Sequence, residues 1–307
     1  MSLRNTFQGM SSWSQLLFLG LFSFLGLFIV SLLIGIASAV YAFMNGNLND
    51  IMSIMQSVNF MRITQFFSTI FMFLIPALLC AYLYNDRPLE YLKVNKPLDP
   101  KFTVISIGLI FIVQPIISFL SYYNEKLKLP EFMNGIENWM QKMEKANAAT
   151  MDFLMAGNSV TVLIINLIII AVMAGLTEEI FFRGSMQQIF NKISNNYHVA
   201  VWVTAFIFSA IHLQFYGFVP RLLLGALLGY LFVWSRNLWV PIIVHFINNA
   251  MGVIIYWRFH GTPEYQKIED MGVNDLWWAT LLSVILTSVI IAFLLNEYNR
   301  KHKYAEF

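Results

Sequence analysis

Five ionisable side chains lie inside long apolar stretches of this 307-residue sequence. They are two neighbouring acids, an arginine and two histidines, namely Glu178, Glu179, Arg183, His212 and His245. An ionisable residue within an apolar span is costly to place and by default marks a functional site. A carboxylate beside an imidazole can hold a water molecule and take its proton, which is general-base chemistry suited to hydrolysis.

The two acids are expected to have different tasks. Glu179 and Arg183 are four residues apart with the acid first, which is the favourable order for an ion pair along a helix. Two desolvated charges that pair can both persist where neither could alone. Glu178 is rotated by about 100° from Glu179 around a helix and cannot share that arrangement well. We therefore expect Glu179 and Arg183 to support the helix, and Glu178 to be the free carboxylate and the catalytic candidate.

The spacing of residues along the chain predicts that Glu178 lies near a histidine. Position 195, in the polar link 191–198, is 17 residues from Glu178 and 17 from His212 (195 − 178 and 212 − 195). In an antiparallel helix pair, that separation corresponds to roughly 25 Å at most from the turn. We therefore expect Glu178 and His212 to lie at one depth on adjacent spans.

A third apolar stretch carries a second polar pair. His245 and Asn249 are four residues apart and so share one helix face. From the turn at 235–238 they lie about 13 and 19 Å deep, which overlaps the depth expected for Glu178. An imidazole and an amide on one face can donate hydrogen bonds to a developing oxyanion. Asn248 is rotated off this face, and we expect it only to pack.

A metal-dependent chemistry is the alternative. Glu178, His212 and His245 are residue types that bind zinc, with a water molecule in the open position. The HExxH metal motif and the GxSxG nucleophile motif are both absent from the sequence. The residues alone leave glutamate-dependent and zinc-dependent hydrolysis open, and they favour the metal-free form.

The elements that must position these residues are membrane spans. The chain is 58% hydrophobic and 12% charged, whereas a soluble domain has about 25% charged residues. The net charge of +2 and the lack of a basic motif argue against nucleic-acid binding. Runs of about 20 apolar residues can span a bilayer. We predict a single all-α integral membrane domain over residues 1–307, a polytopic helical bundle with about eight spans near 14–43, 63–84, 103–122, 160–182, 199–215, 218–234, 238–257 and 277–296.

Two further features concern the membrane faces. The segment 130–156 has apolar residues at helical spacing and charges elsewhere around the wheel, which predicts one amphipathic interfacial helix between spans three and four. It could pack structurally or act as a substrate gate. Lysine and arginine cluster in 87–101, and such clusters favour the cytoplasmic side. We therefore expect a multi-pass protein of the cell membrane with both termini in the cytoplasm.

The three polar sets together resemble a known signature. Glu178, Glu179 and Arg183, then Phe208 with His212, then His245 with Asn249, look like the three motifs of the CPBP intramembrane endopeptidases (the CAAX-processing and bacteriocin-processing, or Abi, family). The region 160–257 carries them, about a third of the chain, and the eight-span layout is similar to that of the type II CAAX prenyl endopeptidases.

The resemblance implies a function and assigns roles. It implies that Glu178 and His212 activate a water molecule, that His245 and Asn249 form the oxyanion site, and that Glu179 and Arg183 support both. Members are often labelled metalloproteases, with zinc as the alternative cofactor. The substrate would be a membrane-associated or lipidated peptide or protein in the bilayer.

Two other functions remain open from the sequence. One is a non-enzymatic immunity or scaffold protein that keeps the fold. The other is a proton-coupled transporter, although the sequence shows no pair of related halves of the kind expected for transporters.

Overall fold

The protein is an all-α bundle of antiparallel helices. The computed structural model describes residues 6–44 and 51–303, and no strand occurs among them. Part of the predicted domain 1–307, residues 1–5, 45–50 and 304–307, lies outside the described residues. The helices are α1 (Ser12–Met44), α2 (Ile51–Met55), α3 (Val58–Thr69), α4 (Ile75–Tyr84), α5 (Pro88–Tyr91), α6 (Pro100–Ile112), α7 (Gln114–Glu125), α8 (Asn134–Met155), α9 (Val160–Asn166), α10 (Ala174–Phe181), α11 (Gln187–Ser194), α12 (Tyr197–Ala210), α13 (Phe218–Ser235), α14 (Trp239–Phe259), α15 (Pro263–Glu269) and α16 (Trp277–Lys303).

Several of these helices join into longer rods through other helical turns. π-helical segments connect α3 to α4 (η2, Ile70–Leu74), α9 to α10 (η4, Leu167–Met173) and α10 to α11 (η5, Phe182–Met186). Short 3₁₀ turns precede α8 (η3, Glu131–Met133) and α16 (η6, Asn274–Leu276). The fourth predicted span is therefore one helical rod from Val160 to Ser194.

The membrane-spanning character is confirmed, with one correction to the span count. In the described part of the chain, seven helical rods are long and apolar enough to cross a membrane. The predicted span 199–215 is only the 14-residue helix α12, which extends about 21 Å and is shorter than a hydrocarbon core of about 30 Å. The helix stops at Ala210, so His212 lies in the turn that follows and not inside a helix.

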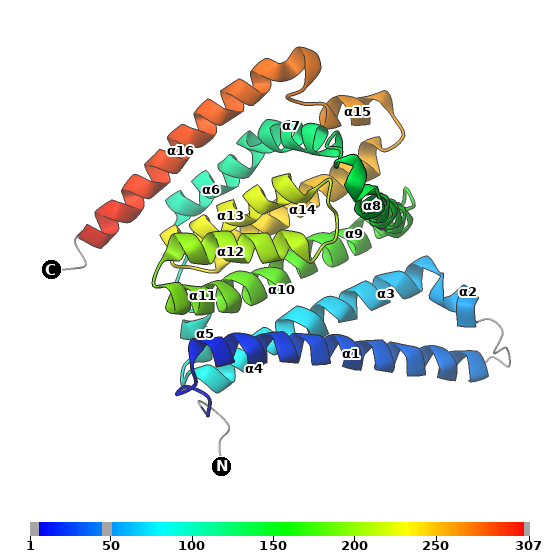
Figure 1. Cartoon of the computed structure of the whole chain (residues 1–307), viewed down its shortest axis with the longest axis horizontal. Coiled ribbons are helices and arrows are strands. Elements are labelled where there is room, and N and C mark those ends of the chain that lie inside the picture. The colour runs from blue at the N-terminus through cyan, green and yellow to red at the C-terminus, as the bar shows by residue number, and fades with distance from the viewer. Residues whose placement is uncertain (1–5, 45–50, 304–307) are drawn as a thin grey trace.

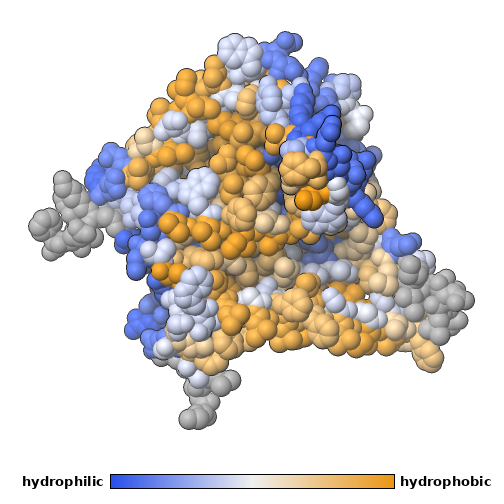
Figure 2. All heavy atoms as spheres, viewed as in Figure 1, coloured by the Kyte–Doolittle hydropathy of each residue, from blue (hydrophilic) through white to orange (hydrophobic). Residues whose placement is uncertain are grey.

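Consecutive passes of the chain run in opposite directions when the shorter α12 is counted among them. Figure 1 shows α1 beginning and α16 ending at the same side of the bundle, because α12 adds a further pass to the seven long rods. In Figure 2, apolar side chains cover the middle of this face, and hydrophilic residues gather toward its two ends. This distribution is typical of a protein whose middle is surrounded by lipid.

Small residues let the central helices approach closely. A methyl group added at Gly225 would lie 3.3 Å from the Ala205 Cβ, and one at Gly229 would lie 3.0 Å from Val201 Cγ1. The GxxxG pair of α13 therefore packs against α12. Gly175 does the same for α10 and α14, because a Cβ there would lie 3.0 Å from the backbone nitrogen of Phe246.

The predicted amphipathic helix is present as α8. It follows Pro130 and η3, and it lies between α7 and α9 in the chain. The guanidinium of the buried Arg62 donates to the Leu154 carbonyl at 2.6 Å, and the Tyr256 hydroxyl lies 3.2 Å from Asp152. The end of α8 is thus fastened to α3 and α14.

Candidate active site

A buried ion pair forms the base of the site. Arg183 Nη1 donates to Glu179 Oε1 at 2.5 Å, and both side chains are fully buried. Arg183 Nη2 also donates to the Gly225 carbonyl at 2.7 Å, and its guanidinium lies over the Phe208 ring. The predicted pair between Glu179 and Arg183 is confirmed, and Arg183 additionally joins α13 to the fourth rod.

Glu179 also fixes the orientation of His245, a contact that spacing along the chain does not predict. The same Oε1 atom lies 2.8 Å from His245 Nδ1, so this ring nitrogen donates to the carboxylate. The other ring nitrogen, Nε2, lies 4.0 Å from Glu178 Oε2. One imidazole is therefore held between two carboxylates, and the close approach of α14 to α10 at Gly175 makes this possible.

Glu178 is the less constrained of the two acids. Its side chain is 12% exposed, whereas that of Glu179 is not exposed at all. Within the described residues no hydrogen bond engages the Glu178 carboxylate, and its contact with His245 Nε2 is longer than a hydrogen bond. Its oxygens are thus available to accept a proton from a water molecule or substrate.

His212 lies in the turn between α12 and α13. Its Nδ1 lies 2.7 Å from the Phe208 carbonyl and must donate to it, which leaves Nε2 as an acceptor. The Phe208 ring contacts both imidazoles, with centroid distances of 5.0 Å to His212 and 6.0 Å to His245. In the described structure no hydrogen bond or ion pair joins Glu178 directly to His212; the neighbour that contacts Glu178 is His245.

The turn that carries His212 is stabilised by side chains from other helices. Asn124 of α7 donates to the carbonyls of Phe215, at 2.9 Å, and of Tyr216. Asn147 of α8 donates to the His212 carbonyl at 3.4 Å. Irregular backbone at membrane depth is tolerated only where its polar groups are satisfied within the protein. These two asparagines provide that satisfaction, and no motif in the sequence marks them for it.

Asn249 is positioned by a π-helical turn. Its amide donates to the Ile170 carbonyl of η4 at 3.1 Å, and its oxygen accepts from Asn248 at 3.2 Å. Gln114 of α7 in turn donates to the Asn248 oxygen at 3.3 Å. Asn248 therefore connects Asn249 to a neighbouring helix, which is more than the packing role we expected. π-helical turns occur frequently at functional sites, and η4 and η5 flank α10 on both sides.

The three predicted zinc ligands do not form a ligand set. Among the described residues, no group of three or more histidine, cysteine, aspartate or glutamate side chains is arranged to hold a metal ion. Nδ1 of His245 donates to Glu179 and Nδ1 of His212 donates to a backbone carbonyl, and both bonds are compatible with metal ligation through Nε2. It is the missing grouping of three side chains in the described part of the chain, and not the ring tautomers, that separates this arrangement from a metal centre.

Comparison with known proteins supports the same region. Residues 160–251 match the family model described as type II CAAX prenyl endopeptidase Rce1-like. This segment is similar to that family, and the match confirms the family resemblance predicted from the motifs.

A curated relative matches a similar length of chain. An uncharacterized protein, YpbD, of Bacillus subtilis is 29% identical over 90 residues, which are 28% of this chain and 43% of that protein. The alignment thus spans less than half of the relative. No solved structure matches the chain.

Proposed function

We propose that this protein is an intramembrane endopeptidase that hydrolyses a peptide bond in a membrane-associated or lipidated peptide, using a directly activated water molecule. The observation that carries the proposal is the arrangement around His245. Its Nδ1 is held by the fully buried Glu179 at 2.8 Å, and its Nε2 faces the free carboxylate of Glu178 at 4.0 Å. A carboxylate left without a hydrogen bond beside an oriented imidazole is suited to proton transfer.

Glu178 and His212 activate the water in this proposal. The Glu178 oxygens and His212 Nε2 are both free to accept a proton, because His212 already donates through Nδ1 to Phe208. The water gives its proton to this pair while its oxygen attacks the carbonyl carbon. The peptide C–N bond then breaks as the same proton passes to the departing amine. In this proposal a water molecule bridges Glu178 and His212, so the two side chains act together without contacting each other.

His245 and Asn249 stabilise the oxyanion. With Nδ1 donating to Glu179, His245 can donate from Nε2 only as an imidazolium. That charge would offset the net negative charge of Glu178, Glu179 and Arg183 taken together. The Asn249 amide has two N–H bonds, and the Ile170 carbonyl accepts only one of them. The second remains to donate to the oxyanion.

The surrounding structure supports the active groups. Glu179 and Arg183 keep His245 oriented, and α8 holds the turn of His212 through Asn147. We place the catalytic core at residues 160–257, and we place the protein in the cell membrane with both termini in the cytoplasm. The basic segment 87–101 would then face the cytoplasm as well.

The test uses the purified full chain in lipid nanodiscs and two synthetic peptides. The peptides are identical except that one carries an isoprenyl group on a cysteine four residues from its C-terminus. Mass spectrometry of the products identifies the bond that is cut. Cleavage of the lipidated peptide in preference to the plain one assigns the substrate class, and equal cleavage of both limits the assignment to membrane peptides in general.

Variants separate the chemistry from the fold. Glu178→Ala and His212→Ala are each expected to lower the cleavage rate at least about 100-fold, the effect of losing a general base. His198→Ala is the matched control, because His198 is exposed and bonds Tyr230. If both active-site variants cleave at the wild-type rate, the catalytic assignment is wrong.

A further inference from the structure

A basic pocket lies apart from the candidate active site, where several spans end. It has a volume of about 600 Å³ and is lined by Glu90, Lys93, Asn95, Lys96 and Arg236. All five residues lie in links between helical rods, four between α4 and α6 and one between α13 and α14. A volume of this size lies in the range of small-molecule sites.

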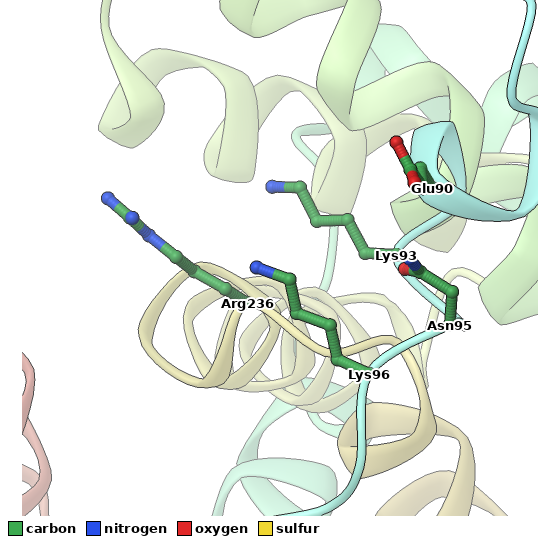
Figure 3. A pocket seen from close by; sticks show the side chains of 5 residues that line it. All are labelled: Glu90, Lys93, Asn95, Lys96 and Arg236. Atoms are coloured by element: carbon green, nitrogen blue, oxygen red, sulfur yellow. The ribbon is translucent and has the colours of Figure 1, made fainter.

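The positive charges of this pocket are not neutralised by the protein. Figure 3 shows the side chains of Lys93, Lys96 and Arg236 extending in the same direction, with Glu90 set apart from their charged ends. No salt bridge engages any of the three cations within the described residues. The single acid, Glu90, pairs with Arg87 at 3.2 Å. Three cations therefore share one space without a counter-ion.

The pocket is held in shape by the backbone. Leu238 N donates to the Lys93 carbonyl at 3.0 Å, and the buried Asn237 donates to the carbonyls of Lys96 and Pro97 at 3.0 and 3.1 Å. Trp239 Nε1 donates to the Val94 carbonyl at 3.1 Å. The two links are thus fastened together before any ligand binds.

Two of the cationic residues have a backbone conformation that residues other than glycine rarely adopt. Lys93 has a φ of 57° and Arg236 a φ of 50°, both in the left-handed region that glycine and asparagine favour. Such strain persists only where the surroundings over-determine it, and it clusters at functional sites. At both positions the strained residue is a lysine or arginine that lines the pocket, so the strain directs positive charge there.

The surroundings favour a ligand that is part of the membrane. The pocket residues lie between the ends of α4 and α13 and the starts of α6 and α14, where chains leave the bilayer. Leu89 is 61% exposed and Trp239 is 39% exposed beside it. Exposed apolar and tryptophan side chains at this level are typical of the lipid interface, and basic pockets between spans bind anionic head groups.

From these observations we propose that Lys93, Lys96 and Arg236 bind the phosphate group of an anionic phospholipid at the ends of α4, α6, α13 and α14. Guanidinium and ammonium groups are the usual partners of phosphate. Burial of Lys93, and then the charges of Arg236 and Lys96, lower the pKa of its ammonium group to about 8. A bound phosphate would relieve that repulsion.

Binding to the full-length protein tests the proposal. The purified chain in a neutral detergent is titrated with phosphatidylglycerol, with phosphatidylcholine and with inorganic phosphate, and native mass spectrometry counts the bound molecules. Phosphatidylglycerol is expected to bind at least about tenfold more tightly than phosphatidylcholine, because both carry a phosphate but the quaternary ammonium of phosphatidylcholine cancels its charge and would be repelled by the three cations. Equal binding of the two lipids would overturn the proposal. Binding of inorganic phosphate as tight as that of phosphatidylglycerol would replace the lipid with a soluble ligand.

Matched variants locate the site. Lys93→Asn and Arg236→Asn remove the charges and place at both positions a residue that tolerates the left-handed backbone. Each is expected to weaken phosphatidylglycerol binding about tenfold. Lys101→Gln is the control, because Lys101, like Lys93, lies 4.9 Å from an aromatic ring but is outside the pocket. If the control loses as much affinity as the pocket variants, general surface charge and not the pocket binds the lipid.

One more variant protects the test against a folding defect. Lys96→Gln changes an exposed side chain outside any helix, so the fold should not depend on it. It should also weaken phosphatidylglycerol binding about tenfold. Unchanged binding by Lys96→Gln and by whichever of the other variants folds would refute the site.

Discussion

The ion pair of Glu179 and Arg183 makes a strong prediction about stability. Both side chains are fully buried, and the same Glu179 oxygen serves Arg183 at 2.5 Å and His245 at 2.8 Å. Breaking a buried pair by removing one partner leaves an uncompensated charge and costs about 3–5 kcal/mol. Glu179→Gln and Arg183→Met should each lower the free energy of unfolding by that amount.

The double variant should lose far less free energy of unfolding than the two single variants lose in sum. With both charges removed, the introduced glutamine can still accept from His245 through its amide oxygen, and the methionine fills much of the arginine volume. Replacing a buried ion pair by uncharged groups of similar size often changes the free energy of unfolding very little. The Gly225 carbonyl also loses the hydrogen bond from Arg183, which costs about 1 kcal/mol. We expect a total loss of about 1–2 kcal/mol.

The assay is reversible unfolding of the purified variants in mixed micelles with rising denaturing detergent. Cleavage is measured on the same samples. The double variant should regain stability but remain at least about tenfold less active, because His245 has lost its anionic acceptor. Additive destabilisation, with the double variant losing as much as both singles together, would refute the description of these two residues as a coupled pair.

Three further outcomes follow from other parts of the structure. Gly175→Ala should destabilise the protein by about 1–3 kcal/mol, because its methyl group would press on the backbone of Phe246. The control is Gly252→Ala on the neighbouring helix α14, where an added methyl group meets open space, so the unfolding temperature should stay unchanged or rise. Equal effects of the two variants would contradict the close approach of α10 and α14. Affinity for phosphatidylglycerol, measured by native mass spectrometry between pH 7 and 10, should be highest below about pH 8 and fall as Lys93 loses its proton. Lys93→Asn should abolish that dependence, and a flat wild-type profile would exclude Lys93. Cleavage should continue at the same rate after chelator treatment, and a loss of activity that added zinc restores would show a metal requirement.

Much of the bundle could be predicted because apolar length determines it. Seven of the predicted spans correspond to rods that are long enough to cross a membrane, and the amphipathic helix α8 follows its periodicity and Pro130. The exception is α12, whose predicted span extends too far along the chain. The apolar run continues beyond Ala210, but the helix ends there because the following turn obtains its hydrogen bonds from Asn124 and Asn147. Those residues come from distant segments, and no local pattern reveals them.

The candidate site shows the same division between local and distant signals. The spacing of Glu179 and Arg183 predicted a contact within one helix, and the structure contains it. The bond between Glu179 and His245 depends on how two rods pack at Gly175, which spacing along the chain does not report. The π-helical turn that presents the Ile170 carbonyl to Asn249 likewise has no periodic signature, because the apolar run through η4 is uniform.

The rate of peptide cleavage by Glu178→Gln tests the central claim most directly. The substitution keeps the shape of the side chain and removes its ability to take a proton. The purified variant in nanodiscs should unfold at the temperature of the wild type, since no hydrogen bond in the described structure depends on this carboxylate. Its cleavage of a lipidated peptide should be slower by about 100-fold or more. Cleavage within about threefold of the wild-type rate, at equal stability, would show that Glu178 is not the base.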